Sequence, residues 1–467
     1  MEGDKSGDPV LDFIPPFCPD WISHPEITVK QDIPEEWFPL TKQPVAILGN
    51  GKSGQGVHAL LQKIGWDSII YDQAENDFRA SDAGKTSLVI YSPGFVPDHP
   101  WIELAKKCGK LVLSEVDFAA KFLDARVVAI TGTNGKSSLT TILAHVWSKI
   151  GRTGFAGGNL GEPLSSILAN EDTSQSTLFL EMSSFQARGL QVLNPAYTLW
   201  TNFSPDHLNY HGSLRDYFLS KYRLIERTNP RSVWLTQQVV ETAEKFSVKI
   251  PDGVNIVPET SIELPRDHFL NTYPQKQNLS LACAWLKNQG VAEDIIVDAL
   301  LDYKPEPHRL SKVCSIDEVK FWNDSKSTNL GSVISACKSF PAKIIWIGGG
   351  QSKGDDLGEY ARSLKPYVSH AFLFGESSTS LHQCMTDAGI LSTISRSLSE
   401  AVSQAYQAAQ QAVDILFSPG FASFDHFKNY LERGNSFIQF VLDLKNTVLK
   451  GTQEGSHFHT PSRKLLV

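Results

Sequence analysis

The segment Val127–Ser138 constrains the fold more than any other part of this sequence, and it reads VVAITGTNGKSS. Its apolar, β-branched start predicts a strand, its glycines predict a turn, and the following LTTILAHVWSKI predicts a helix. Such a turn gathers unpaired backbone N–H groups at the positive end of a helix, where a polyphosphate binds. Lys136 is then placed to neutralise the β- and γ-phosphates, and the Ser137 hydroxyl to bind Mg²⁺. The stretch from Gly132 to Gly135 is shorter than in the standard phosphate loop, but its setting favours an ATP site over an ordinary turn.

Composition limits the class of protein. A chain of 467 residues favours about three domains, at roughly 150 residues each. A hydrophobic content of 41% and a charged content of 20% are ordinary for a globular protein. The net charge of −8 argues against a nucleic-acid partner, no apolar run is long enough to span a bilayer, and the first residues lack the pattern of a secretory signal. The six cysteines form no C-x-x-C pair, so we expect no zinc ribbon or redox motif and predict a cytoplasmic protein without a membrane partner.

Short apolar runs alternate with helix-like segments along most of the chain. This alternation predicts an α/β fold of open, mostly parallel sheets covered by helices. Strands are expected at 44–48, 68–71, 88–91, 126–131, 177–180, 343–347, 370–374 and 413–417. We divide the chain into an N-terminal extension (1–40), a Rossmann-like domain (41–124), a central P-loop ATPase-like domain (125–306), a Rossmann-like C-terminal domain (307–448) and a flexible tail (449–467).

A second glycine motif opens the first of these domains. Gly49-x-Gly51-x-x-Gly54 follows a predicted strand, and Asp72 stands at the end of the next one. This pattern is typical of a Rossmann site for a diphosphate and, taken alone, suggests NAD. A single match of this kind is weak evidence, and Asp72 fits equally well as a solvated residue at a strand end. The turn Ser92-Pro93-Gly94 follows the third strand and is predicted to lie at the same sheet edge.

Polar side chains also follow strands of the middle block. Glu181 comes directly after strand 177–180, where a P-loop enzyme places its Mg²⁺ group. Asp206 and His207 follow the apolar run YTLW, although a lone histidine is more often structural and Mg²⁺ prefers oxygen ligands. Lys221 lies in a helix-like segment and, from its surroundings alone, is best interpreted as a solvated lysine.

The third block carries its polar residues in loops after apolar runs. Charged and amide groups are costly to bury unpaired, so loops rich in them indicate function. Loops at the strand ends of all three blocks are expected to converge on a cleft between domains. The loops of the third block are Pro307–Leu310, Phe321–Asn329, Gly348–Gly354 and Ser418–Asp425.

Together these motifs resemble those of the Mur ligase family. The matching pieces, in family order between residues 44 and 440, are TGTNGKSS, GGNLG, LEMSSFQ, TNFSPDHLNYH, PHRL, NDSKSTN, GGGQSKGDD and SPGFASFDHFKNYLERGNSF. TGTNGKS marks the whole family, whereas SSFQ, NDSKSTN and ASFDHFKN are similar to the branch that uses D-glutamate. The D-N-P-R signature of the branch that adds a diamino acid is not found in the sequence.

The resemblance implies an ATP-dependent amide ligase that adds D-glutamate to UDP-N-acetylmuramoyl-L-alanine. This reaction is a step of peptidoglycan synthesis, on which the cell wall, cell shape and cell division depend. ATP phosphorylates the L-alanine carboxylate, the D-glutamate amine attacks the acyl phosphate, and phosphate leaves. Dense positive charge suits this chemistry, because the carboxylate and the triphosphate are both anionic. ATP and two Mg²⁺ ions are the implied cofactors, with a carbamylated Lys221, and we expect a monomer.

The resemblance also implies roles for individual residues. Catalytic roles fall to Lys136, His207, Lys221, Lys326 and Lys353. The implied ATP ligands are Gly132, Thr133, Asn134, Gly135, Lys136, Ser137, Ser138, Asn278, Arg309 and Asp324. One Mg²⁺ is assigned to Ser137 and Glu181, and a second to His207 and the carbamate on Lys221. The implied substrate ligands are Gly49, Gly51, Ser53, Gly54, Asp72, Gln73, Ser92, Pro93 and Gly94 for the uridine diphosphate, Asn159 for the muramoyl-alanine end, Thr328, Ser423 and Tyr430 for D-glutamate, and Ser183.

The sequence departs from the family pattern at three places. Pro274-Gln275 stands where a His-Asn pair usually precedes the Asn matched by Asn278, which bears on the adenine contacts. Three glycines, Gly348–Gly350, open the loop of Lys353 where two are usual. Tyr430 replaces a phenylalanine near D-glutamate.

Three other functions compete with this interpretation. Folylpolyglutamate synthase shares the phosphate loop and glutamate chemistry but lacks a first uridine-nucleotide block. An NAD-dependent oxidoreductase accounts for Gly49–Gly54 and leaves the phosphate loop unexplained. A scaffold with a retired ATPase predicts the loss of Lys136, Glu181 or Lys326, and all three residues are present.

Overall fold

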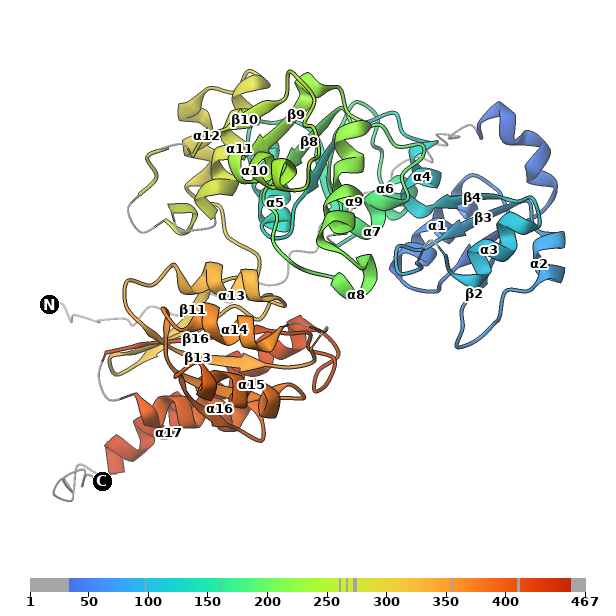
Figure 1. The fold of residues 1–467 in the computed structure, drawn as a ribbon. Coiled ribbons are helices and arrows are strands. Elements are labelled where there is room, and N and C mark those ends of the chain that lie inside the picture. The colour runs from blue at the N-terminus through green and yellow to red at the C-terminus, as the bar shows by residue number, and fades with distance from the viewer. Residues whose placement is uncertain are drawn as a thin grey trace, which may run out of the picture.

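The computed structural model describes residues 33–454, apart from residues 97, 160, 260–261, 266–267, 272–274, 353, 355 and 410–411. Figure 1 shows three α/β lobes, each built on its own sheet. The fold class predicted from the alternation of apolar runs is therefore confirmed. All eight strands expected from these runs are present, with nearly the same bounds. Among the described residues, no helix combines the length and apolarity needed to cross a membrane.

The first lobe has a four-stranded parallel sheet in the order β2-β1-β3-β4. Its strands are β1 (Val45–Leu48), β2 (Ser68–Tyr71), β3 (Leu88–Tyr91) and β4 (Leu111–Ser114). Its helices are η1 (Glu35–Lys42), α1 (Lys52–Lys63), α2 (Ala80–Lys85), α3 (Pro100–Lys107) and α4 (Glu115–Ala120).

The end of the expected N-terminal extension belongs to this lobe. Residues 35–40 are part of the 3₁₀-helix η1, and Trp37 is only 3% exposed. Its indole stacks on Phe118 with ring centroids 6.0 Å apart. The expectation of a loose extension is therefore wrong for residues 35–40, because the burial of an aromatic ring anchors them. Residues 1–32 lie outside the described part of the chain.

The central lobe has a six-stranded parallel sheet in the order β10-β9-β8-β5-β7-β6. Its strands are β5 (Arg126–Thr131), β6 (Gly154–Gly158), β7 (Thr177–Glu181), β8 (Tyr197–Trp200), β9 (Val233–Thr236) and β10 (Asn255–Val257). Its helices are α5 (Lys136–Lys149), α6 (Leu164–Asn170), α7 (Ser184–Arg188), α8 (Leu208–His211), α9 (Leu214–Glu226), η2 (Pro230–Ser232), α10 (Gln237–Lys245), η3 (Phe269–Asn271), α11 (Gln275–Asn288) and α12 (Glu293–Leu300).

The third lobe has a six-stranded sheet in the order β11-β12-β16-β13-β14-β15, parallel except that β11 runs antiparallel to β12. Helix α17 continues to Glu454. The flexible tail expected from residue 449 is therefore wrong for residues 449–454, which are helical. The strands are β11 (Ser311–Ile316), β12 (Val319–Asn323), β13 (Ile344–Gly349), β14 (Val368–Phe374), β15 (Leu391–Ile394) and β16 (Asp414–Gly420). The helices are α13 (Leu330–Cys337), α14 (Leu357–Leu364), α15 (Ser378–Asp387), α16 (Leu398–Ala408) and α17 (Tyr430–Glu454).

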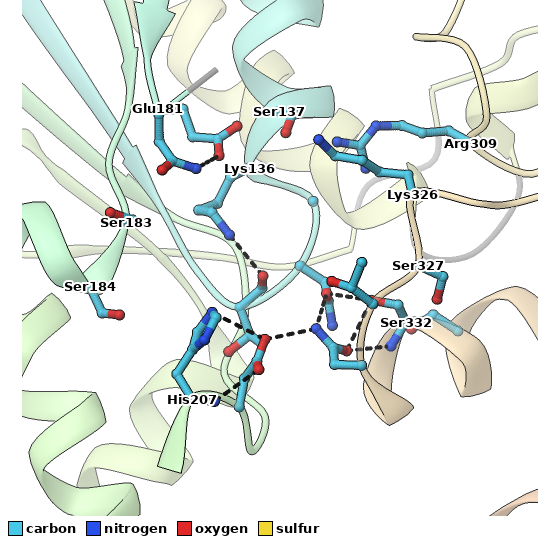
Figure 2. Close-up of a pocket in the computed structure, with 18 of the residues that line it drawn as sticks. Lys136, Ser137, Glu181, Ser183, Ser184, His207, Arg309, Lys326, Ser327 and Ser332 are labelled. Atoms are coloured by element: carbon cyan, nitrogen blue, oxygen red, sulfur yellow. Dashed lines mark hydrogen bonds and ion pairs between the residues drawn. The ribbon is translucent and has the colours of Figure 1, made fainter. Parts of the chain in front are cut away.

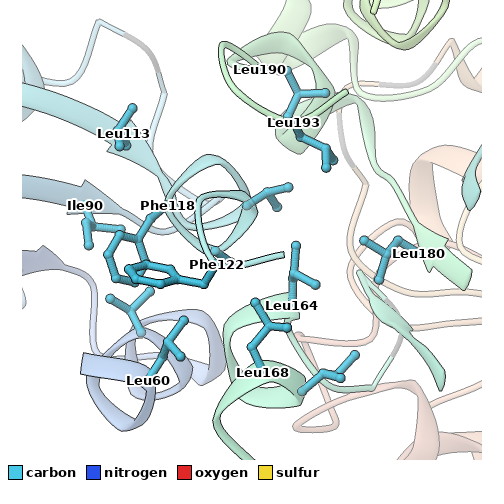
Figure 3. Packing of buried hydrophobic residues seen from close by; sticks show 14 of the residues in the cluster. Leu60, Ile90, Leu113, Phe118, Phe122, Leu164, Leu168, Leu180, Leu190 and Leu193 are labelled. Carbon is cyan, nitrogen blue, oxygen red and sulfur yellow. The ribbon is translucent and has the colours of Figure 1, made fainter. Parts of the chain in front are cut away.

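One hydrophobic cluster joins the first and central lobes. Figure 3 shows Leu60 and Phe118 of the first lobe on one side of this cluster, with Leu164 and Leu168 of the central lobe facing them. The third lobe has its own clusters, which contain no residue of the other two lobes. Burial of apolar surface is the largest favourable term in such packing, so the first two lobes form one unit against which the third is placed.

Two buried carboxylates reinforce this junction. Glu115 Oε1 accepts hydrogen bonds from the Ser165 backbone N–H at 2.8 Å and from its hydroxyl at 2.6 Å. Asp117 accepts three backbone N–H groups of residues 191–193, at 2.8, 2.9 and 3.0 Å. Both acids belong to α4 of the first lobe, and all their partners named here belong to the central lobe.

We expect Glu115→Gln to make the free energy of unfolding less dependent on pH. Burial raises the pKa of Glu115 above its ordinary 4.5, and the nearby charge of Asp117 acts in the same direction. The folded wild type therefore holds this proton more tightly than the unfolded chain, so stability falls as pH rises from about 4.5 to the raised pKa. Gln keeps an oxygen for Ser165 and does not titrate. In denaturant titrations the variant should gain stability relative to wild type as pH rises, whereas a constant difference would contradict this account.

Candidate active site

The phosphate loop links β5 to α5 with a backbone that only glycine tolerates at two positions. Gly132 has a φ of +145° and Gly135 a φ of +82°. A Cβ on Gly132 would lie 2.0 Å from the Thr201 hydroxyl, and a Cβ on Gly135 would lie 2.5 Å from the Asn278 amide. The loop therefore has a left-handed backbone at two closely packed glycines, and it leads into the N-terminus of α5, where Gly135, Lys136 and Ser137 line the cavity. A helix N-terminus that lines a cavity is suited to an anion.

The neighbouring strand β8 supports this loop through residues just after its end. The Asn202 backbone carbonyl accepts the Thr133 N–H at 3.0 Å, and its side-chain oxygen accepts the Asn134 N–H at 2.9 Å. The Thr201 hydroxyl donates to the Asn134 carbonyl at 2.6 Å. These bonds hold the loop open before any ligand arrives, which lowers the entropic cost of binding one.

Lys136 and Glu181 form the charged centre of the site. The Lys136 ammonium donates to the Thr133 carbonyl at 2.8 Å, folded back over its own loop. Glu181 ends β7 and is 3% exposed, and its Oε1 accepts the Asn159 amide at 2.7 Å. Burial alone raises the pKa of Glu181, but the Lys136 charge and the Asn159 bond outweigh it and lower the pKa. Glu181 is therefore a buried anion, and its Oε2 has no hydrogen-bond partner within the described chain.

Lys221 and His207 line the same cavity from α9 and the start of α8. Lys221 is 1% exposed and its amine donates to the Gly132 carbonyl at 2.8 Å. Burial and the Lys136 charge hold the pKa of Lys221 well below its usual range. His207 has a left-handed φ of +54°, and its Nε2 lies 3.5 Å from the Asp206 carboxylate. The interpretation of Lys221 as a solvated lysine is therefore wrong, because α9 packs this face against the phosphate loop.

The third lobe closes the cavity opposite the phosphate loop. Arg309 pairs with Glu306 at 2.9 Å, and the Lys326 ammonium lies 3.9 Å from the centre of the Tyr430 ring. Asp324 is 9% exposed and accepts the Ser418 hydroxyl at 2.8 Å, and burial raises its pKa to about 7. Cationic groups of the third lobe thus face the loop that carries Lys136 (Figure 2).

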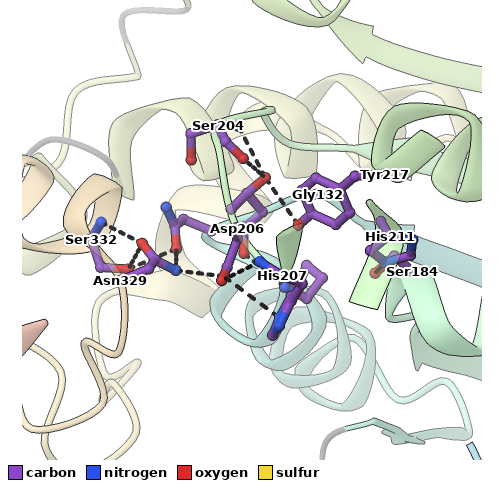
Figure 4. A network of polar contacts seen from close by, with 12 residues as sticks. Gly132, Ser184, Ser204, Asp206, His207, His211, Tyr217, Asn329 and Ser332 are labelled. Atoms are coloured by element: carbon purple, nitrogen blue, oxygen red, sulfur yellow. Dashed lines mark hydrogen bonds and ion pairs between the residues drawn. The ribbon is translucent and has the colours of Figure 1, made fainter. Parts of the chain in front are cut away.

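Direct contacts tie this lobe to the phosphate loop. Asn329 donates to the Asp206 carboxylate at 2.9 Å, and the Ser332 hydroxyl donates to the Asn134 side chain at 2.7 Å. Figure 4 shows this network between the two lobes. Asn329 belongs to the loop Phe321–Asn329 that the sequence indicates to be functional, whereas Ser332, in the first turn of α13, was not singled out.

The cavity has a volume of about 330 Å³ and gathers most of the predicted ATP and metal residues. In the described part of the chain, no three His, Cys, Asp or Glu side chains come together as a metal cage. The predicted residues that line the cavity are Thr133, Asn134, Gly135, Lys136, Ser137, Asn159, Glu181, Ser183, His207, Lys221, Arg309, Asp324, Lys326 and Thr328.

Other predicted residues lie outside the lining. Asn278 is buried under Gly135, and its amide donates to Gln275 at 3.1 Å, so Gln275 reaches the cavity where Asn278 was expected. Ser423 is buried in the loop after β16, and Tyr430 contacts the cavity through Lys326. Lys353 lies outside the described residues. Gly132 is buried in the phosphate loop and Ser138 is buried in α5, and neither lines the cavity.

Comparisons with known proteins agree with this arrangement. A family model described as the Mur ligase middle domain matches residues 130–257. The UDP-N-acetylmuramoylalanine–D-glutamate ligase of Aquifex aeolicus is 30% identical over 408 residues, covering 85% of this chain and 97% of that relative. The enzyme of the same name from Latilactobacillus sakei is 31% identical over 447 residues, with coverage of 85% and 97%. The chain belongs to the Mur ligase family.

A solved Mur ligase structure shares the whole fold. The MurF ligase of Thermotoga maritima, solved in complex with ADP, superposes with a TM-score of 0.55 at 16% identity and covers 85% of this chain and 95% of that one. The succession of three α/β lobes is therefore that of a Mur ligase.

The first lobe of this Mur ligase carries the second glycine motif at the carboxyl edge of its sheet. A Cβ on Gly54 would lie 1.9 Å from the Gly49 carbonyl, so glycine permits the close approach of α1 to the β1 turn. Asp72 accepts the backbone N–H of Asn50 at 3.0 Å, and this bond and a second one from Ala74 lower its pKa. Asp72 thus holds the glycine turn in place. The Ser92 hydroxyl beside Gly49 is buried and has no hydrogen-bond partner in the described residues.

The remaining uridine residues predicted for this Mur ligase cluster around that turn. The Gln73 amide lies 3.2 Å from the His99 ring. Gly51 caps α1, whose first turn contains Ser53. Pro93 and Gly94 form the turn after β3.

Proposed function

We propose that this Mur ligase joins D-glutamate to UDP-N-acetylmuramoyl-L-alanine with the hydrolysis of ATP to ADP and phosphate. The observation that carries the proposal is the convergence of Lys136 and Glu181 from one lobe with Arg309 and Lys326 from another around a single cavity. The names of relatives that match over most of their length supply the two substrates. The product is a precursor of peptidoglycan, and the enzyme is proposed to act as a cytoplasmic monomer.

The proposed reaction begins with activation of a carboxylate. A carboxylate oxygen of the L-alanine end attacks the γ-phosphorus, the bond from that phosphorus to the β-γ bridging oxygen breaks, and ADP leaves. Lys136 and Arg309 offset the charge of two anions brought together. The D-glutamate amine then attacks the acyl carbon, the C–O bond to phosphate breaks, and the amine proton passes to solvent.

The donor set of the cavity fits Mg²⁺. Glu181 Oε2 is buried and without a hydrogen-bond partner in the described chain, and the Ser137 hydroxyl opens α5 in the same cavity. Carboxylate and hydroxyl oxygens with phosphate oxygens make the oxygen shell that this ion prefers. When bound, Mg²⁺ neutralises charge on the β- and γ-phosphates. We assign Ser137 and Glu181 to this ion, and His207 and Lys221 to a second ion position.

Lys221 is proposed to be carbamylated. Its lowered pKa favours the unprotonated amine, which attacks CO₂; an N–C bond forms, and one proton leaves to solvent. We expect a carbamate carbon signal in the NMR spectrum of protein equilibrated with ¹³C-bicarbonate, and a matching loss of activity when CO₂ is removed. Lys221→Arg should lack both the signal and the activity, because the guanidinium stays protonated. Full activity in the absence of CO₂ would contradict the proposal.

The binding of the other substrates is assigned to separate lobes. Residues Gly49–Gly54, with Ser92–Gly94, are proposed to hold the uridine diphosphate, because the backbone leaves no room for a side chain at Gly49 and Gly54, and the Ser92 hydroxyl beside Gly49 has no hydrogen-bond partner among the described residues. Asn159 and Ser183 are proposed to lie near the muramoyl-alanine end. Lys326, Thr328, Lys353, Ser423 and Tyr430 are assigned to D-glutamate, with lysines facing its carboxylates.

A phosphate-release assay with single omissions tests the proposed function. Release should require ATP, UDP-N-acetylmuramoyl-L-alanine and D-glutamate together, and should match the amide product mole for mole. L-Glutamate serves as the matched control substrate. Addition of glutamate to a folate, or reduction of NAD, would instead support the folylpolyglutamate synthase or oxidoreductase alternatives.

A further inference from the structure

The linker between the central and third lobes carries an anion at the edge of a cavity built for anions. Glu306 lies in this linker, and its carboxylate accepts the Nε–H of Arg309 at 2.9 Å. The Glu306 and Arg309 side chains are only 24% and 15% exposed, so salt screens this pair less than a surface ion pair. Arg309 lines the cavity, whereas Glu306 does not. A carboxylate beside Arg309 repels phosphate groups, so its presence there requires a compensating role.

The bond to Glu306 uses only one of the five donors of the Arg309 guanidinium. Arginine has one N–H on Nε and four on its two Nη atoms. Glu306 accepts the Nε–H, and among the described residues none accepts a hydrogen bond from either Nη atom of Arg309. Figure 2 shows this side chain reaching from the third lobe toward the loop of Lys136. Four donors of Arg309 are therefore available to a ligand while its Nε stays bonded.

A second arginine of the third lobe shows the opposite pattern. Arg433 is 0% exposed, and all three of its nitrogens donate to protein atoms. Its Nε donates to the Ser325 hydroxyl at 3.1 Å, its Nη1 to the Phe421 carbonyl at 2.9 Å and its Nη2 to the Ser325 carbonyl at 2.8 Å. Arg433 therefore ties two loops together, whereas Arg309 is held only at the base of its guanidinium.

A bond at Nε sets the direction of the outer donors, because the guanidinium is planar. Rotation about the Cδ–Nε bond of Arg309 would turn the Nε–H away from Glu306 and break the hydrogen bond. The plane of the guanidinium, and with it the four N–H groups on Nη1 and Nη2, is thus restrained before a ligand arrives. A side chain restrained in this way loses less conformational entropy when an anion binds.

The linker places Glu306 without the help of a ligand. A proline stands on each side of Glu306, and the proline that follows favours an extended backbone at this residue. Before these prolines, the hydroxyl of the buried Tyr303 lies 2.8 Å from the Thr141 hydroxyl of α5. After them, the Leu310 N–H donates to the Asp324 carboxylate at 3.2 Å. The linker is therefore anchored to the central lobe at one end and to the third lobe at the other.

We infer that Glu306 is a positioning residue, which holds Arg309 at Nε and directs its outer N–H groups toward the phosphates of bound ATP. This inference rests on the proposed function, which brings ATP into the cavity, and adds to it a residue outside the cavity lining. Glu306 does not compete with the nucleotide for Arg309, because it occupies a donor that leaves both Nη atoms to the phosphates.

Two substitutions separate the hydrogen-bond acceptor from its charge. Glu306→Ala removes the acceptor and should lower kcat/KM for ATP by about tenfold or more, as expected for the loss of a hydrogen bond to a charged group. Glu306→Gln keeps an amide oxygen for the Nε–H and should stay within about threefold of wild type. In both variants KM for UDP-N-acetylmuramoyl-L-alanine should change by less than about twofold, because its uridine diphosphate is assigned to the first lobe.

A double-mutant cycle shows whether Glu306 acts through Arg309. If it does, Arg309→Ala should have the same kcat/KM for ATP with or without Glu306→Ala, within about twofold, because no guanidinium is left to orient. Losses that multiply in the double variant would show a separate structural role and overturn the inference. Glu226→Ala is the matched control. Glu226 pairs with Arg223, three positions away, at the same distance of 2.9 Å, but these side chains are 47% and 41% exposed, so wild-type kinetics are expected.

Equilibrium binding of ATP, measured without the other substrates, completes the test. The Kd for ATP should rise about tenfold in Glu306→Ala and stay near the wild-type value in Glu306→Gln, with melting temperatures showing that each variant is folded. Unchanged binding and kinetics in Glu306→Ala would overturn the inference. Tighter binding would also overturn it, because Glu306 would then be a competitor for Arg309. If wild type binds ATP but releases no phosphate with both substrates, the proposed function fails, and the binding comparison still decides how Glu306 acts on Arg309.

Discussion

Replacement of Lys136 by Met should lower the rate of phosphate release by about 10²–10³-fold, as expected when a charge that stabilises the transition state is removed. Lys136 is the cation of the phosphate loop, and it shares the cavity with the buried anion Glu181. Methionine keeps the length of the stem and removes the charge. The measurement is steady-state release of phosphate with all three substrates at saturation.

Lys149→Met is the matched control for this prediction. Lys149 ends the same helix α5 and pairs with Asp302 at the surface, with 46% of its side chain exposed. An exposed pair of this kind contributes little to stability, so the control should keep the wild-type rate. Similar rates for Lys136→Met and wild type would show that the loop does not handle phosphate in the reaction.

The second large effect is expected at the junction of the first two lobes. Asp117→Ala should cost about 3–5 kcal/mol of unfolding free energy, because three backbone N–H groups of residues 191–193, one of them buried and two partly buried, lose their acceptors together. The loss should appear in denaturant titration as a lower midpoint. The first lobe should also become more accessible to proteolysis near α4.

Asp117→Asn gives a graded comparison. Asp117 Oδ1 accepts two of the three N–H groups and Oδ2 the third, so the asparagine oxygen can keep two of these bonds. We expect this variant to lie between wild type and Asp117→Ala. Equal stability of all three proteins would mean that the shared apolar cluster alone joins the lobes.

Much of this structure could be predicted from local sequence. The run from Val127 to Ser138 specifies strand, turn and helix, because β-branched residues, glycines and a helix former each favour their own conformation. Glu181 could also be predicted, since a strand end in a parallel sheet places its next residue at the functional edge. In contrast, strand β6 has the sequence GFAGG and is absent from the strands predicted above. It has no β-branched residue, so only its pairing with β7 identifies it as a strand.

Contacts between distant segments could not be predicted in the same way. Lys221 looked like a surface lysine because its helix has charged neighbours, and only the packing of α9 against the phosphate loop buries its amine. The bonds of Asn329 and Ser332 to the central lobe depend on how the lobes meet, which local sequence does not contain.

Transfer of an isotope tests the central claim most directly. UDP-N-acetylmuramoyl-L-alanine labelled with ¹⁸O in its carboxylate is converted with ATP and D-glutamate, and the released phosphate is analysed by mass spectrometry. If the carboxylate is activated by phosphorylation, one of its oxygens stays bound to phosphorus when the amine displaces phosphate, so each phosphate carries one ¹⁸O atom. Phosphate without label, at full conversion to the amide, would contradict the account.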